Sequence, residues 1–140
     1  MTQNDRPRTA AALNVLYVED FAPGAALVRD TLARRAPEIR IEIVSTVAQA
    51  IERLSGTQAP GGSGGYDVVL TDLNLSDGLG LDILAHVRSN AALLPVVILT
   101  GSVDDDTLQA ARQAGADGYI SKRGDYLARL AGELHRAAKR

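Results

Sequence analysis

Five short apolar segments alternate with five amphipathic segments along this chain, and this alternation limits the folds that it can adopt. The apolar segments are Leu13 to Val18, Ile39 to Val44, Val68 to Leu70, Val96 to Leu99 and Tyr119-Ile120. Short apolar runs bounded by turn residues are typical of strands buried on both faces. Strands that alternate regularly with helices form a parallel sheet with helices on both faces. The sequence therefore predicts an α/β fold, a five-stranded parallel sheet doubly wound with five helices.

The helical segments and the connecting stretches complete one domain. The expected helices are Pro23 to about Pro37 with the stripe Ala26, Leu27, Thr31 and Leu32, Val47 to Leu54, Leu81 to Arg88, the segment between Asp106 and Gly115, and Gly124 to Arg140. Ile39 to Val44 alternates apolar and charged residues, which predicts an edge strand. Residues 1–12 are expected to form a flexible lead-in and residues 13–140 one domain. Residues 55–65, rich in glycine and serine, are expected to form a flexible loop.

Composition and charge argue against several classes of protein. The net charge of −2 lacks the basic excess that direct nucleic-acid binding requires. Cysteine is absent, which excludes disulfides and thiol chemistry, and His86 and His135 lie too far apart in sequence to indicate a zinc site. No apolar run reaches the length of a membrane span or has the form of a signal peptide. We therefore expect a cytoplasmic protein with no membrane partner.

Polar and charged residues follow four of the predicted strands. They are Glu19 and Asp20, Asp72, Thr100, and Lys122. In a parallel sheet these strands all end at one edge, which is where open α/β folds bind their ligands. We therefore expect three carboxylates, one hydroxyl and one ammonium group to lie close together there.

These residue types suit the transfer of a phosphoryl group to a carboxylate. Carboxylate oxygens are ligands that Mg²⁺ prefers, and Glu19 and Asp20 are the candidates for holding it. Asp72 is the candidate nucleophile, because aspartyl phosphates are established covalent intermediates. Lys122 would neutralise charge on the phosphoryl oxygens, and Thr100 would donate a hydrogen bond to one of them.

The spacing of these residues resembles that of the receiver domains of bacterial two-component response regulators. The similarity covers Leu13 to Leu134 and is carried by LNVLYVED, VVLTDLNLSDGLG, VVILTG and DGYISK. It implies a flavodoxin-like three-layer sandwich. It also implies Mg²⁺-dependent phosphorylation of Asp72 by a histidine kinase or phosphotransfer protein, followed by slow hydrolysis. Such a domain catalyses only its own phosphorylation and dephosphorylation, and it is a signalling domain rather than an enzyme.

The resemblance assigns further roles to individual residues. The implied ligands of Mg²⁺ are Glu19, Asp20, Asp72 and the backbone carbonyl of Asn74. Thr100 would move toward the phosphoryl group, and Tyr119 would rotate inward. The responding surface would be the fourth helix, the fifth strand and the fifth helix. It would contact an output domain or protein that the sequence does not identify.

Three positions depart from the pattern of the family. Glu19 replaces an aspartate, which should keep the metal site, and Ser76 replaces a proline, which should loosen the turn after Asp72. Arg123 stands where proline usually follows the lysine. A cis bond before a residue other than proline costs about 2.5–4 kcal/mol. We therefore expect a trans Lys122–Arg123 bond, with Gly124 adopting the unusual backbone angles.

Two other functions are compatible with this pattern of residues. One is a phosphatase with an aspartyl nucleophile, although such enzymes use a second acid two positions after the nucleophile, where this chain has Asn74. The other is a receiver-like interaction module that is never phosphorylated, although such a module would be expected to lack Asp72, the acidic pair or Lys122.

Several further residues have structural interpretations. Asp104, Asp105 and Asp106 suit the start of a helix, and Asp77 and Asp82 suit a turn and a helix start. Tyr119 could be a core aromatic residue. His86 and His135 are expected at the surface. The stripe of Leu127, Leu130 and Leu134 would pack on the sheet or contact a partner.

Overall fold

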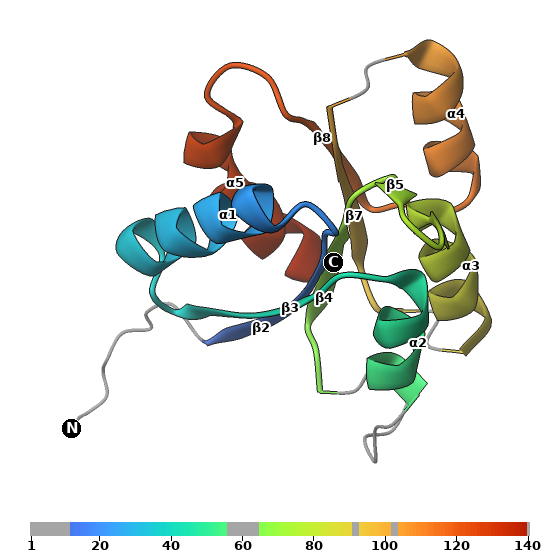
Figure 1. The fold of residues 1–140 in the computed structure, drawn as a ribbon, viewed down its shortest axis with the longest axis horizontal. Coiled ribbons are helices and arrows are strands. Elements are labelled where there is room, and N and C mark those ends of the chain that lie inside the picture. The colour runs from blue at the N-terminus through green and yellow to red at the C-terminus, as the bar shows by residue number, and fades with distance from the viewer. Residues whose placement is uncertain (1–11, 56–64, 91–92, 102–103, 140) are drawn as a thin grey trace.

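The computed structural model describes residues 12–55, 65–90, 93–101 and 104–139. Its main sheet has five parallel strands in the order β3-β2-β4-β7-β8 (Figure 1). The strands are β2 (Leu13–Val18), β3 (Ile39–Val44), β4 (Val68–Thr71), β7 (Val96–Thr100) and β8 (Gly118–Ser121). Most of the predicted lead-in and glycine-rich loop lies outside the described residues. The predicted parallel α/β fold is confirmed.

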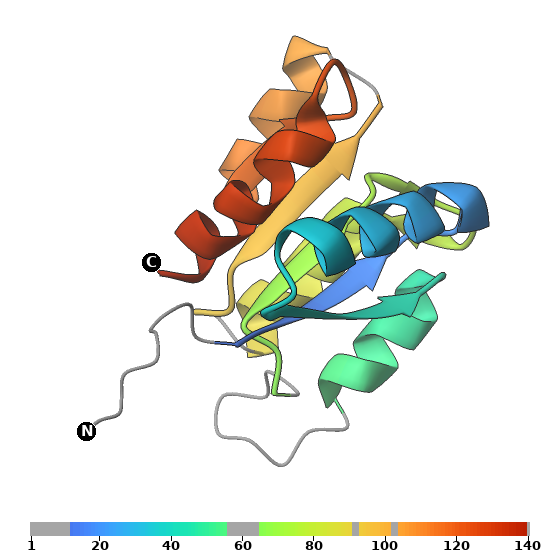
Figure 2. The same ribbon diagram turned by 90° about the vertical axis from the view of Figure 1, so that its left-hand side faces the viewer.

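Helices cover both faces of the sheet. They are α1 (Ala22–Arg35), α2 (Val47–Ser55), α3 (Gly80–Asn90), α4 (Asp105–Gln113) and α5 (Tyr126–Ala138). Helices α1 and α5 pack on one face with one apolar cluster, and α2, α3 and α4 pack on the other face with a second (Figure 1). Figure 2 faces α1 and α5 and shows the strand arrows pointing in one direction. All strand ends therefore meet at one edge.

The burial of the strands follows their sequence patterns. Strands β4 and β7 are buried throughout, because helices cover both of their faces. In edge strand β3 the charged residues are exposed and the apolar residues are buried or partly buried, as its alternating sequence predicted. None of the helices in the described ranges combines the length and apolar character needed to cross a membrane.

Two expectations about the helices require correction. The buried face of α1 consists of Ala25, Val28, Thr31 and Leu32, whereas Leu27 is 48% exposed. Thr31 and Leu32 of the predicted stripe are therefore confirmed as buried, whereas Ala25 and Val28 take the places expected for Ala26 and Leu27. On α5, His135 is not simply solvated. Its Nε2 lies 2.7 Å from Glu38 Oε2 and connects α5 to the turn before β3.

The apolar residues of α5 are core residues. Leu130 and Leu134 are fully buried, and Leu127 packs against the same cluster. The packing interpretation of this stripe is therefore confirmed.

The segment after Asp72 forms a small hairpin that the sequence patterns did not predict. Strands β5 (Asn74–Leu75) and β6 (Gly78–Leu79) pair antiparallel, so Ser76 and Asp77 are the hairpin turn. The Asp77 carboxylate accepts hydrogen bonds from Val47 N and Ala48 N, at 2.7 and 3.0 Å, in the first turn of α2. These bonds lower the pKa of Asp77. A turn expected to be loose is therefore tied to a neighbouring helix.

Candidate functional site

The carboxyl end of β2 delivers two acidic residues with opposite exposure. The Glu19 side chain is buried, with the whole residue 2% exposed, whereas Asp20 is exposed. Backbone pairing continues to this point, because Glu19 N donates to Val44 O at 2.9 Å. The Phe21 N–H donates to Glu19 Oε2 at 3.3 Å. Glu19 therefore faces the interior of the site, and Asp20 faces solvent.

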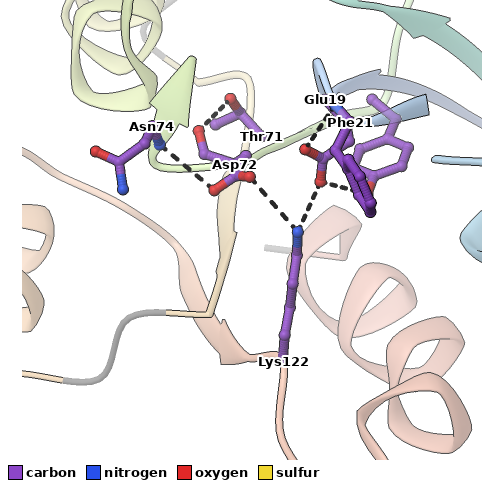
Figure 3. Close-up of polar contacts among 7 residues, drawn as sticks. Glu19, Phe21, Thr71, Asp72, Asn74 and Lys122 are labelled. Atoms are coloured by element: carbon purple, nitrogen blue, oxygen red, sulfur yellow. Dashed lines mark hydrogen bonds and ion pairs between the residues drawn. The ribbon is translucent and has the colours of Figure 1, made fainter. Parts of the chain in front are cut away.

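Asp72 lies at the end of the neighbouring central strand. Its backbone N–H donates to Val18 O at 3.0 Å, which fixes it beside the end of β2. Its Oδ1 accepts a longer bond, 3.4 Å, from Asn74 N, and its side chain is 15% exposed (Figure 3). The carboxylate is therefore held in position and accessible from solvent.

Lys122 connects the two strand ends. Its Nζ donates to Glu19 Oε1 at 2.7 Å and lies 3.5 Å from Asp72 Oδ2, so the ammonium group sits between the two carboxylates (Figure 3). Partial burial by itself would lower the pKa of Lys122. The hydrogen bond that Lys122 donates to Glu19 and the negative charges of both carboxylates outweigh this effect and raise the pKa of Lys122. Lys122 is therefore fully charged at neutral pH.

The loop after Lys122 follows the predicted path. The described residues contain no cis peptide bond, so the Lys122–Arg123 bond is trans as expected, and Gly124 adopts a positive φ of 57°. Lys122 N also donates to Thr100 O at 2.8 Å. The lysine thus points at Asp72 without the proline that is usual in the family.

Thr100 lies on β7 and Tyr119 on β8, the two strands that follow β4 in the order of the sheet. Thr100 is buried at the end of β7 and is paired in register with Ser121, the residue before Lys122. Tyr119 is partly buried and packs against the cluster on the α2, α3 and α4 face. Burial, and then the charge of Asp104, raise its pKa. The Lys122 side chain thus contacts both Glu19 and Asp72, while Thr100 is the last residue of β7 and Tyr119 lies within β8.

The oxygen donors at this edge suit a divalent cation by type. Carboxylate and carbonyl oxygens are the ligands that Mg²⁺ prefers. Within the described ranges, no three acidic, histidine or cysteine side chains are grouped closely enough to hold a metal ion. The Lys122 ammonium group instead pairs with both inner carboxylates and offsets one of their two negative charges.

Sequence reasoning missed two residues of the site. The Tyr17 hydroxyl donates to Glu19 Oε1 at 3.2 Å. Its position two residues before Glu19 could have indicated this contact, because such side chains point to the same face of a strand. The second residue is Gly80, at the start of α3. Its N–H donates to Leu73 O at 2.7 Å, and a Cβ atom there would lie 2.3 Å from Asp72 O.

Replacing Gly80 with alanine is therefore expected to displace the backbone of Asp72. We expect a loss of about 1–3 kcal/mol in the free energy of unfolding, as for other overpacked sites. Gly132→Ala is the matched control, because a Cβ at this exposed position of α5 meets nothing within 4 Å. It should raise the free energy of unfolding by about 0.5–1 kcal/mol. Urea unfolding of the two variants measures both free energies of unfolding. Equal stability of the two variants would contradict this account of Gly80.

Comparison with known proteins connects this geometry to one family. The profile of the response regulator receiver domain matches residues 15–131. The regulatory protein LuxO of Vibrio cholerae is 36% identical over 105 residues, which cover 75% of this chain and 21% of LuxO. The chain spans about a fifth to a quarter of the length of the curated relatives that it matches.

Solved structures show the same similarity. The receiver domain from Rhodospirillum rubrum is 28% identical with a TM-score of 0.73, over 91% of this chain and 92% of that one. The Mn²⁺-bound form of response regulator Rcp1 is 26% identical with a TM-score of 0.74, over 86% of this chain and 90% of that one. The profile match, the strand order and the acidic residues and lysine at one sheet edge agree, and this chain belongs to the family of response regulator receiver domains.

Proposed function

We propose that Asp72 accepts a phosphoryl group from a histidine kinase or phosphotransfer protein, with Mg²⁺. The observation that carries this proposal is the Asp72 carboxylate, which is accessible at the sheet edge with an ammonium group 3.5 Å away. One oxygen of Asp72 attacks phosphorus, and the bond from phosphorus to the donor histidine nitrogen breaks. The nitrogen keeps the electron pair of that bond. Water later hydrolyses the acyl phosphate to Asp72 and inorganic phosphate.

The neighbouring residues stabilise the charge in this transfer. Lys122 is positioned to pair with a phosphoryl oxygen, and the Thr100 hydroxyl donates to another. Glu19, Asp20, Asp72 and the carbonyl of Asn74 would hold the cation, which supplies positive charge to the phosphoryl oxygens. The Mn²⁺-bound form of Rcp1 supports a cation in this family. The domain transforms no separate substrate, because the group that it modifies is its own side chain.

Incubation with Mg²⁺ and acetyl phosphate tests the proposal. A stoichiometric adduct on Asp72 that is stable in acid and labile in base is the expected result. Continuous turnover of the phosphate donor would indicate an aspartyl phosphatase instead. The absence of any adduct, with beryllofluoride also failing to bind, would indicate an interaction module that is not phosphorylated.

Removing the charges of the acidic pair should weaken metal binding. For the double variant Glu19→Gln, Asp20→Asn, we expect the dissociation constant for Mg²⁺ to rise at least about a hundredfold, because uncharged amides replace two carboxylate ligands. Calorimetric titration measures it. The control is Asp105→Asn, Asp106→Asn, which removes two exposed acids from the first turn of α4. An unchanged affinity in the acidic-pair variant would place the metal elsewhere.

We further propose that phosphorylation is reported by the surface of α4, β8 and α5. The support is the position of Tyr119 on β8, the strand that pairs with the one ending in Thr100. Tyr119 lines a groove of about 590 Å³ together with Arg112 and Arg136. Beryllofluoride should change the sedimentation coefficient of the protein alone or with its output partner. Asp72→Ala, which lacks the acceptor, should show no change. Identical sedimentation of free and beryllofluoride-bound protein under both conditions would count against this surface.

A further inference from the structure

Tyr17 is a fully buried tyrosine on β2, two residues before Glu19. It belongs to the apolar cluster between the sheet and helices α1 and α5, together with Val28 and Leu130. A purely apolar ring would fill this position equally well, whereas a buried tyrosine hydroxyl needs a hydrogen-bond partner. That partner is Glu19 Oε1, at 3.2 Å.

The Glu19 carboxylate receives three hydrogen bonds, two from residues close to it in sequence and one from the distant Lys122. Its Oε1 accepts from the Tyr17 hydroxyl of β2 and from Lys122 Nζ, which follows β8. Its Oε2 accepts from Phe21 N, just before α1. A buried carboxylate needs such donors, because the cost of removing its charge from water is otherwise uncompensated. Three donors therefore restrain the orientation of this side chain.

We propose that Tyr17 is a positioning residue of the phosphoacceptor site. Its hydroxyl fixes the orientation of the Glu19 carboxylate, and through it the place of the Lys122 ammonium group between Glu19 and Asp72. Glutamate has one more rotatable bond than the aspartate usual at this position, so its carboxylate needs an additional restraint. Lys122 depends on that restraint, because its contact with Glu19 is 2.7 Å and its contact with Asp72 is 3.5 Å.

The variant Tyr17→Phe removes only the hydroxyl and keeps the ring that fills the core. Tyr66→Phe is the matched control, because the Tyr66 hydroxyl donates to another carboxylate, Glu42 Oε1 at 2.6 Å, away from Asp72. Lys122 and Lys139 are the only lysines in the sequence. Labelling with [¹³C]lysine therefore gives two side-chain signals, and the exposed Lys139 serves as the internal reference.

In Tyr17→Phe, the Lys122 signal is expected to move toward that of Lys139, and in Tyr66→Phe it should stay in place. The dissociation constant for Mg²⁺ should rise about tenfold in Tyr17→Phe, as when a residue that orients a metal ligand is lost. A tyrosine that only satisfies its own hydroxyl would change neither quantity. An unchanged Lys122 signal in Tyr17→Phe overturns the inference, whatever the Mg²⁺ affinity.

The link to phosphorylation rests on the proposed function, but the lysine signal does not. If the wild-type protein forms no adduct with acetyl phosphate while the Lys122 signal shifts in Tyr17→Phe, the proposed function fails and the positioning role stands. If the wild-type protein is phosphorylated and the Lys122 signal is unchanged in Tyr17→Phe, the proposed function stands and the positioning role fails.

Discussion

Replacing Asp72 with alanine is expected to abolish phosphorylation by acetyl phosphate or a kinase while the fold remains intact. The carboxylate is the only proposed acceptor, so no residual rate is expected. Its loss should cost little stability, because its contacts with Asn74 N and Lys122 are long, at 3.4 and 3.5 Å. Lys122 keeps its shorter bond to Glu19. Removing one of two nearby carboxylates also relieves repulsion, so the free energy of unfolding should be unchanged or higher.

Asp77→Ala serves as the control, because it should lower stability and leave phosphorylation intact. It removes the carboxylate that accepts from the first two amides of α2, which should lower the free energy of unfolding, as the loss of other helix caps does. Phosphorylation at Asp72 should persist. Mass spectrometry of intact protein and urea unfolding separate the two variants. Phosphate uptake by Asp72→Ala at the wild-type rate would remove Asp72 from the acceptor role.

The second large effect is expected for Lys122→Met. This change leaves the buried Glu19 carboxylate without its cation, and breaking a buried ion pair in this way typically costs 3–5 kcal/mol. Because the Lys122 side chain is 23% exposed, solvent should reduce the loss to about 2–3 kcal/mol. Phosphorylation should slow severely, because the ammonium group 3.5 Å from the Asp72 carboxylate is lost. Lys139→Met, at an exposed position, should change stability by no more than about 0.5 kcal/mol.

The contribution of Lys122 should depend on pH in a defined direction. Its pKa is raised in the folded state. The stabilisation is therefore complete below the ordinary lysine pKa of about 10.4 and is lost as pH rises through the higher folded value. Urea unfolding from pH 7 to pH 11 should show the wild-type protein and Lys122→Met converging only at the alkaline end. A constant difference across this range would show that the ion pair is not its source.

The sequence predicted the fold and the residues at the sheet edge for one physical reason. Burial on both faces makes each central strand a short apolar run, so strands such as Val68–Thr71 and Val96–Thr100 are visible without any tertiary information. Parallel strands end at one edge, so polar residues after separate strands are predicted to meet there. Glu19 and Lys122, which are 103 positions apart, are in contact for this reason. The trans Lys122–Arg123 bond followed from the local cost of a cis bond.

Only the tertiary structure decided which of these residues touch and how deeply each is buried. Glu19 and Asp20 are adjacent acids in the sequence, yet one is buried under three hydrogen-bond donors and the other is exposed. Local patterns likewise gave no sign that Asp77 caps α2 or that His135 contacts Glu38. Periodicity records which positions are apolar along one element. The choice of hydrogen-bond partner depends on where another element, many residues away, places its donor, and that placement exists only once the helices have packed on the sheet.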